Sequence, residues 1–145
     1  MANTALFTWM ITACGGLYLF AVWLIEYDRE YQTAAATRLP IPVICLHLLL
    51  AAGGLVVWAI YDITSIRTFA LAAAAALSAV VVLGLAMAIR WLGVRRASVG
   101  GVGAAAVVTV APERNFPVSV VIAHGVLAVT TYVLVLLITF RPGSV

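Results

Sequence analysis

The sequence predicts an all-α, polytopic membrane protein, in which 145 residues form one bundle of four transmembrane helices. Hydrophobic residues make up 66% of the chain and charged residues only 9%, whereas soluble domains contain about 25% charged residues. Four apolar stretches are each long enough to cross a bilayer, which takes about 20 residues. Together they leave no room for a soluble domain, so residues 1–145 are expected to be a single membrane domain.

The four predicted helices cover residues 5–25, 40–61, 68–92 and 116–140. The first is followed by the charged cluster Glu26–Glu30, which should continue the helix just outside the membrane. Pro40 and Pro117 open the second and fourth helices, since proline is tolerated in a first helical turn. The connection over residues 62–67 is short, so the second and third helices should be antiparallel neighbours.

The third connection, residues 93–115, is the only long one. Within it, residues 98–110 are rich in glycine, alanine and valine. This composition is compatible with a small hairpin, a flexible loop or a loop at the membrane surface.

Small residues and tryptophans give the remaining packing signals. Ala74-x3-Ser78 and Ala75-x3-Ala79 have the small-x3-small spacing that lets membrane helices approach closely. Four tryptophans fall near helix ends, where aromatic side chains often anchor a protein at the membrane surface. They are Trp9, Trp23, Trp58 and Trp91.

The distribution of arginine predicts the orientation, because positive charge accumulates on the cytoplasmic side. All eight basic residues are arginine. The first and third connections and their flanks carry six: Arg29, Arg38, Arg90, Arg95, Arg96 and Arg114. The opposite side carries Arg67 and Arg141. This asymmetry predicts that both termini face outward. The absence of lysine beside abundant alanine, valine and leucine indicates a GC-rich bacterial genome, so we expect a protein of the bacterial cytoplasmic (inner) membrane. Arginines spread along membrane edges also argue against nucleic-acid binding.

The only two histidines occupy matching positions. His47 and His124 each follow a proline by seven residues, at the start of an apolar run. Gly16-Leu…Trp23-Leu24 and Gly84-Leu…Trp91-Leu92 form a second matching pair, so the chain reads either as two duplicated helical hairpins or as chance similarity. Duplicated hairpins of the same topology are related by an axis along the membrane normal. Such an axis would place both histidines at one depth, roughly 10 Å inside the cytoplasmic end.

A histidine inside a membrane helix is costly unless something binds it, so the pair is the candidate site. One hypothesis is ligation of a single haem b, with His47 and His124 as axial ligands of the iron. The bundle offers glycine and alanine where a macrocycle needs room, and Arg38, Arg90 and Arg114 are expected where cations would meet its propionates.

This layout resembles the core of the dihaem cytochromes b, in which the second and fourth helices of a four-helix bundle carry the haem-ligating histidines. The resemblance implies that His47 and His124 are the axial pair. That family has two histidines per helix and two haems, whereas this chain has one per helix, which allows at most one haem. The stretch Phe116–Leu137 also resembles the last helix of small uncharacterised four-helix integral membrane proteins of actinobacteria, which implies the fold and no chemistry.

Several functions stay open at this point. The chain is either a small haem carrier that passes electrons to a partner or quinone, or an accessory subunit whose histidines hydrogen-bond to neighbouring helices and bind no cofactor. For the second case the expected partners of His47 are the neighbours of Cys45, Ser119 or a backbone carbonyl. His124 is expected to reach Thr130 or Thr131 only across a different helix, because both are too far along its own. A bundle that binds lipid, quinone or another small molecule is a third reading.

Other classes are disfavoured. No span carries a central Asp, Glu or Lys of the kind that ion-coupled transporters use. A lone metal site lacks a third ligand at the histidine depth. No nucleophile–base pair or nucleotide-binding motif is present, so catalysis by this chain alone is not expected. The expected partners are membrane lipids and either other membrane subunits or further copies of the chain.

Overall fold

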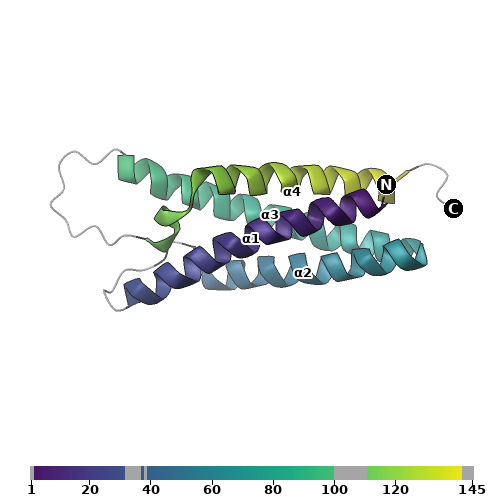
Figure 1. Ribbon diagram of the computed structural model, residues 1–145, viewed down its shortest axis with the longest axis horizontal. Coiled ribbons are helices and arrows are strands. Elements are labelled where there is room, and N and C mark those ends of the chain that lie inside the picture. The colour runs from purple at the N-terminus through teal and green to yellow at the C-terminus, as the bar shows by residue number, and fades with distance from the viewer. Residues whose placement is uncertain (1, 32–36, 38, 100–110, 142–145) are drawn as a thin grey trace.

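The computed structural model describes residues 2–31, 37, 39–99 and 111–141, with the backbone alone at 28–31 and 97–99. Within these ranges the chain forms four long helices that run along one axis (Figure 1). They are α1 (Ala2–Tyr31), α2 (Ile41–Thr64), α3 (Arg67–Val99) and α4 (Val118–Thr139). All four are long and apolar enough to cross a membrane. The protein is therefore a multi-pass membrane protein with the predicted all-α, four-helix fold.

The helix ends follow the local sequence, with one difference from expectation. As predicted, α1 continues through the charged cluster to Tyr31. The third helix was expected to end at Leu92, but α3 continues to Val99. Gly93 does not end it, because an isolated glycine costs only about 1 kcal/mol inside a helix. The loop or hairpin expected over residues 98–110 falls almost entirely outside the described residues.

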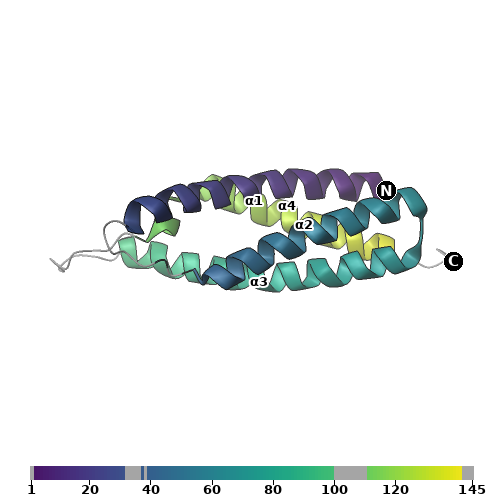
Figure 2. The ribbon, with the colours of Figure 1, turned by 90° about the horizontal axis from the view of Figure 1, so that it is seen from below.

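Prolines and one left-handed residue define the other helix ends. Pro40 and Pro117 are the N-cap residues of α2 and α4, in extended backbone conformation, as their place in the sequence predicts. Ser65 ends α2 with φ 56°, and its N–H donates to the Tyr61 carbonyl. This left-handed cap turns the chain sharply, so α3 begins two residues later and runs back along α2 (Figure 2).

The four helices form a bundle in which α2 packs most closely on α3, and α1 on α4. Contacts between α3 and α4 and between α1 and α2 close the ring. The helices α2 and α4 therefore lie diagonally opposite each other, as do α1 and α3. The start of α1 and the end of α4 lie at one end of the bundle, called here the termini end, and the short 3₁₀ helix η1 (Pro112–Asn115) lies at the other end (Figure 1).

The bundle core is small, and most large apolar side chains face outward. The main core cluster joins all four helices and includes Ala5, Trp58, Ala73, Leu77 and Val135. In contrast, many leucines, isoleucines and valines are more than half exposed on the outer surface. In water such a surface would be unstable, whereas lipid tails accept it without cost, which agrees with four membrane-spanning helices.

Two packing expectations need correction. All four tryptophans are buried within the protein, at 0–7% exposure, so their side chains are not anchors at the lipid surface. Of the small-residue pairs, Ala74 is buried and Ser78 reaches Tyr132 of α4, with 3.1 Å between the hydroxyl oxygens. Ala75 and Ala79, however, are exposed, because they occupy the outer face of α3.

Candidate histidine site

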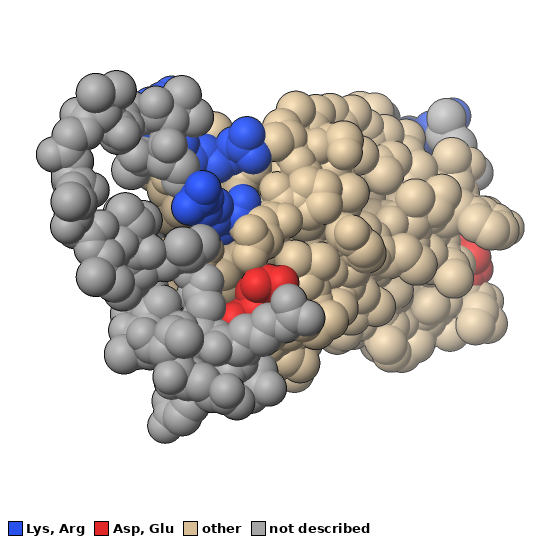
Figure 3. Space-filling model, turned by 60° about the vertical axis from the view of Figure 1, so that its left-hand side comes forward, with Lys and Arg blue, Asp and Glu red and all other residues tan. Residues whose placement is uncertain are grey.

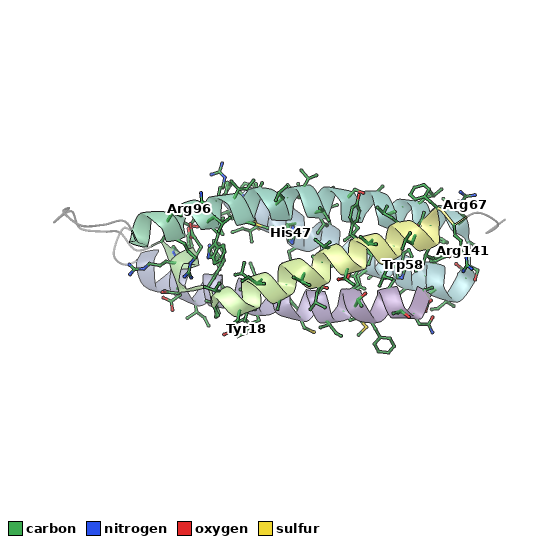
Figure 4. The ribbon with its side chains drawn as sticks, turned by 90° about the horizontal axis from the view of Figure 1, so that it is seen from above. Tyr18, His47, Trp58, Arg67, Arg96 and Arg141 are labelled. Atoms are coloured by element: carbon green, nitrogen blue, oxygen red, sulfur yellow. The ribbon has the colours of Figure 1, made fainter. Side chains whose placement is uncertain are left out.

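The two histidines lie at matching depths on helices that run in the same direction. Each is six residues into its helix, which places it about 9 Å from the helix start. Both side chains are partly buried. Figure 4 shows His47 within the bundle, nearer the end marked by Arg96 than the end marked by Arg67 and Arg141.

Each imidazole is hydrogen-bonded to the backbone of a neighbouring helix. Nδ1 of His47 lies 3.0 Å from the Val80 carbonyl oxygen of α3. Nδ1 of His124 lies 2.9 Å from the Thr12 carbonyl oxygen of α1. Of the partners expected for a purely structural histidine, the backbone carbonyl is therefore the one found, and Ser119, Thr130 and Thr131 are not bonded to either ring.

These bonds determine which tautomer the rings adopt. A carbonyl oxygen only accepts hydrogen bonds, so Nδ1 must carry the proton and donate it. In the neutral ring the proton is then absent from Nε2, whose lone pair is left available. No hydrogen bond to either Nε2 is found among the described residues. Both histidines thus present an unprotonated Nε2, the form in which imidazole binds a metal.

Each imidazole ring packs against a glycine of the same helix that accepts its hydrogen bond. A Cβ added at Gly84 would lie 3.1 Å from Cε1 of His47. A Cβ added at Gly16 would lie 3.0 Å from Cε1 of His124, and one at Gly15 would lie 3.6 Å from its Nδ1. A methyl group at Gly16 or Gly84 would lie closer to the ring than ordinary packing allows and would force it to shift by a few tenths of an ångström, so glycine suits the close approach at which the hydrogen bond forms.

The two halves of the chain repeat this arrangement. Thr12 lies four residues before Gly16, and Val80 lies four residues before Gly84. The α1–α4 pair therefore holds His124 in the same way as the α3–α2 pair holds His47. Exchanging α1 with α3 and α2 with α4 maps one contact onto the other, as a two-fold axis along the bundle would.

The predicted propionate-binding arginines are only partly placed. Arg90 and Arg114 are exposed side chains at the η1 end of the bundle. Arg38 lies outside the described residues. Figure 3 shows basic surface gathered at this end, to which Arg95 and Arg96 also contribute. Arg95 was counted only for orientation, yet its guanidinium lies 5.4 Å from the ring centre of Trp91, within cation–π distance.

Buried polar groups join η1 to the bundle at the same end. Thr37 Oγ1 donates to the Glu113 carboxylate at 3.1 Å and accepts from the indole N–H of Trp23 at 3.2 Å. Glu113 itself is fully buried. Asn115 donates to Glu26 at 3.0 Å, which adds a second link between η1 and α1. The sequence did not predict this cluster, because its members are far apart in the chain.

One buried donor at this end is unsatisfied. Trp91 is 7% exposed, and its indole Nε1 has no hydrogen-bond partner among the residues that the structure describes. The matching tryptophan in the first half of the chain, Trp23, has Thr37 as its acceptor. A buried N–H without an acceptor is destabilising and calls for a physical explanation.

Other parts of the described chain offer little that competes with the histidine site. The described residues contain no group of three or more His, Cys, Asp or Glu able to hold a metal ion. An open groove of about 680 Å³ lies at the termini end, between the start of α1 and the end of α4, and Leu134, Leu137 and Phe140 contribute to its apolar lining. Neither histidine lines this groove.

Comparison of the chain with protein-family models, with curated proteins and with solved structures found no match. The class of the protein, a four-helix multi-pass membrane protein, therefore rests on the sequence and the fold alone.

Proposed function

We propose that this protein is a small electron carrier of the membrane that binds one haem b through His47 and His124. The observation that carries the proposal is that both imidazole rings have the same hydrogen-bonding pattern. Each has Nδ1 bonded to a backbone carbonyl and Nε2 without a protein partner. A structural histidine needs only one of its nitrogens satisfied, whereas an axial ligand needs this particular division between the two.

The arrangement of the helices supports the proposal. Diagonally opposite α2 and α4 carry the imidazoles, and α1 and α3 contribute Gly16 and Gly84 at the same level. The surrounding bundle is apolar, and the cationic end with Arg90, Arg95 and Arg114 is the side that would receive the propionates. Bound haem would supply one-electron transfer, to a protein partner or a quinone; the chain contributes ligation, orientation and a dry environment.

The proposed function also depends on which membrane holds the protein and on which side each end of the bundle lies. The arginine-rich end with η1 faces the cytoplasm of a bacterial inner membrane, and the termini face outward. Arginine asymmetry supports this assignment, because six of the eight arginines fall in the first and third connections of the sequence and their flanks. The electron partner would then approach the haem from the cytoplasmic side.

The test is haem titration of protein purified in detergent. We expect a Soret band that saturates at one haem per chain, and sharp low-spin α and β bands on reduction. His47→Ala and His124→Ala should each remove the low-spin spectrum, because each takes away one axial ligand. A colourless preparation from cells supplied with haem, which also fails to bind added haem, would refute the proposal.

Thr130→Val is a suitable control for the two histidine variants. Thr130 lies in α4 six residues beyond His124, is exposed, and bonds only to the Val126 carbonyl of its own helix. Its replacement should leave the haem spectrum unchanged. If only one histidine variant lost the low-spin spectrum, a different sixth ligand would be present.

The second candidate is an accessory subunit in which the histidines only hold helices together. The two imidazole–carbonyl bonds favour it, since such bonds between membrane helices contribute about 0.6 kcal/mol each on average. This role predicts that both alanine variants lower thermal stability while the purified protein binds no haem. The titration above therefore separates the two candidates.

A further inference from the structure

We infer that the indole N–H of Trp91 is a hydrogen-bond donor to a propionate of the bound haem. This inference rests on the proposed function and assigns a residue that the sequence did not single out for the site. Among the described residues, Nε1 of Trp91 has no hydrogen-bond partner. The protein encloses it at the end of the bundle that carries the arginines.

The position of Trp91 along α3 fits this role. Trp91 lies seven residues beyond Gly84, which supports the His47 ring, and this spacing corresponds to about 10 Å along the helix axis. A haem held at the level of the histidines, with its propionates directed to the arginine-rich end, has its carboxylates at a comparable distance from the iron. The donor and the acceptor therefore fall in the same layer of the bundle.

The charge around Trp91 also suits a carboxylate. The guanidinium of Arg95 lies over the indole ring, with its central carbon 5.4 Å from the ring centre. This places a positive charge beside a neutral N–H donor. Hydrogen bonds to a charged acceptor are stronger than those between neutral groups, so a carboxylate is the acceptor that best offsets burial of the indole.

Trp23 occupies the matching position in the first half of the chain, and there the protein itself provides an acceptor for the indole N–H. Trp23 follows Gly16 by seven residues, as Trp91 follows Gly84. Its N–H donates to Thr37 Oγ1 at 3.2 Å. The two halves of the chain thus differ at one point: the first supplies an acceptor for its tryptophan, and the second leaves the donor open.

The experiment compares haem loss from Trp91→Phe and Trp23→Phe. Holoprotein in detergent is mixed with excess apomyoglobin, and the rate of haem transfer is followed in the visible spectrum. We expect Trp91→Phe to accelerate haem loss at least about tenfold, the usual effect of losing a hydrogen bond to a charged group. Trp23→Phe should change the rate far less, since its N–H bonds to the protein. Both variants should keep the low-spin, bis-histidine spectrum.

Haem dimethyl ester distinguishes a propionate contact from a packing effect. Esterification removes the negative charge of the propionates. The ratio of the haem-loss rates of Trp91→Phe and wild-type protein should therefore fall toward one. If Trp91→Phe does not fold, benzothienylalanine at position 91 replaces the N–H by sulfur and keeps the shape of the indole. An equal effect on haem and on its ester, or equal rates for the two phenylalanine variants, would overturn the inference while leaving histidine ligation intact. Failure of wild-type protein to bind any haem would instead refute the proposed function.

Discussion

At the scale of single residues, each histidine depends on one carbonyl and one glycine of the facing helix. Because Nδ1 is already bonded to Thr12 or Val80, the rings cannot rotate away without losing a hydrogen bond. The glycines make that approach possible, and they do so at equivalent positions of α1 and α3. The orientation of each imidazole is thus set by a backbone carbonyl, which side-chain substitutions do not remove.

Replacing these glycines tests the role of close approach. Gly16→Ala and Gly84→Ala would put a Cβ at 3.0 and 3.1 Å from the histidine Cε1 atoms, so each should destabilise the bundle by about 1–3 kcal/mol. Gly53→Ala is the matched control, because a Cβ there meets nothing within 4 Å. Thermal unfolding in detergent measures the effect. Equal melting temperatures for all three variants would show that the close glycine–histidine contacts do not contribute to the stability of the bundle.

At this scale the sequence predicted the depth of the histidines and included a backbone carbonyl among the partners of His47, but not which carbonyl either ring would reach. Spacing from Pro40 and Pro117 gives the height of a residue along its helix. The partner of His47 depends instead on the rotation of α2 and on its neighbour, and neither is encoded locally. The tryptophans illustrate the same limit: their height suggested anchors at the membrane surface, whereas helix rotation turns all four inward.

At the scale of elements, η1 is fastened into the end of the bundle by buried polar groups. The carboxylate of Glu113 is fully buried and accepts a hydrogen bond from Thr37, which also accepts from Trp23. The link holds together the first connection, α1 and the segment before α4. It was not predictable from sequence, since Glu113 reads there as an ordinary charged residue of a long loop.

Thr37→Val tests this link. The valine has the size of threonine but removes both the donor to Glu113 and the acceptor of Trp23, so we expect a loss of about 1–3 kcal/mol in unfolding free energy. Thr130→Val, which removes an exposed hydroxyl bonded within its own helix, should change stability by less than about 0.5 kcal/mol. Similar losses for the two valine variants would contradict the structural role given to η1.

At the scale of the whole molecule, composition predicted the fold because few alternatives exist. Backbone groups in lipid must be bonded within their own segment, so apolar stretches of this length become helices. The pairwise packing of α2 on α3 and of α1 on α4, and the two-fold relation between the histidine contacts, came from the structure. The internal repeat in the sequence had pointed to that relation, and the matching contacts support a duplicated hairpin.

The proposed orientation is testable by labelling single cysteines. In protein whose native Cys14 and Cys45 are replaced by alanine, a cysteine at Ser65 should react with a membrane-impermeant maleimide in intact cells, because the α2–α3 turn lies at the termini end. A cysteine at Arg96, near the opposite end, should react only after the membrane is opened. The reverse pattern would place the termini in the cytoplasm.

The central claim is that His47 and His124 bind one iron together. Near-infrared magnetic circular dichroism of the ferric, haem-loaded protein reads axial ligands directly, because the charge-transfer band of low-spin haem depends on ligand identity. We expect a bis-imidazole band in wild-type protein and its loss in both His47→Ala and His124→Ala. A wild-type spectrum without bis-imidazole ligation, or one that persists in either variant, would contradict it.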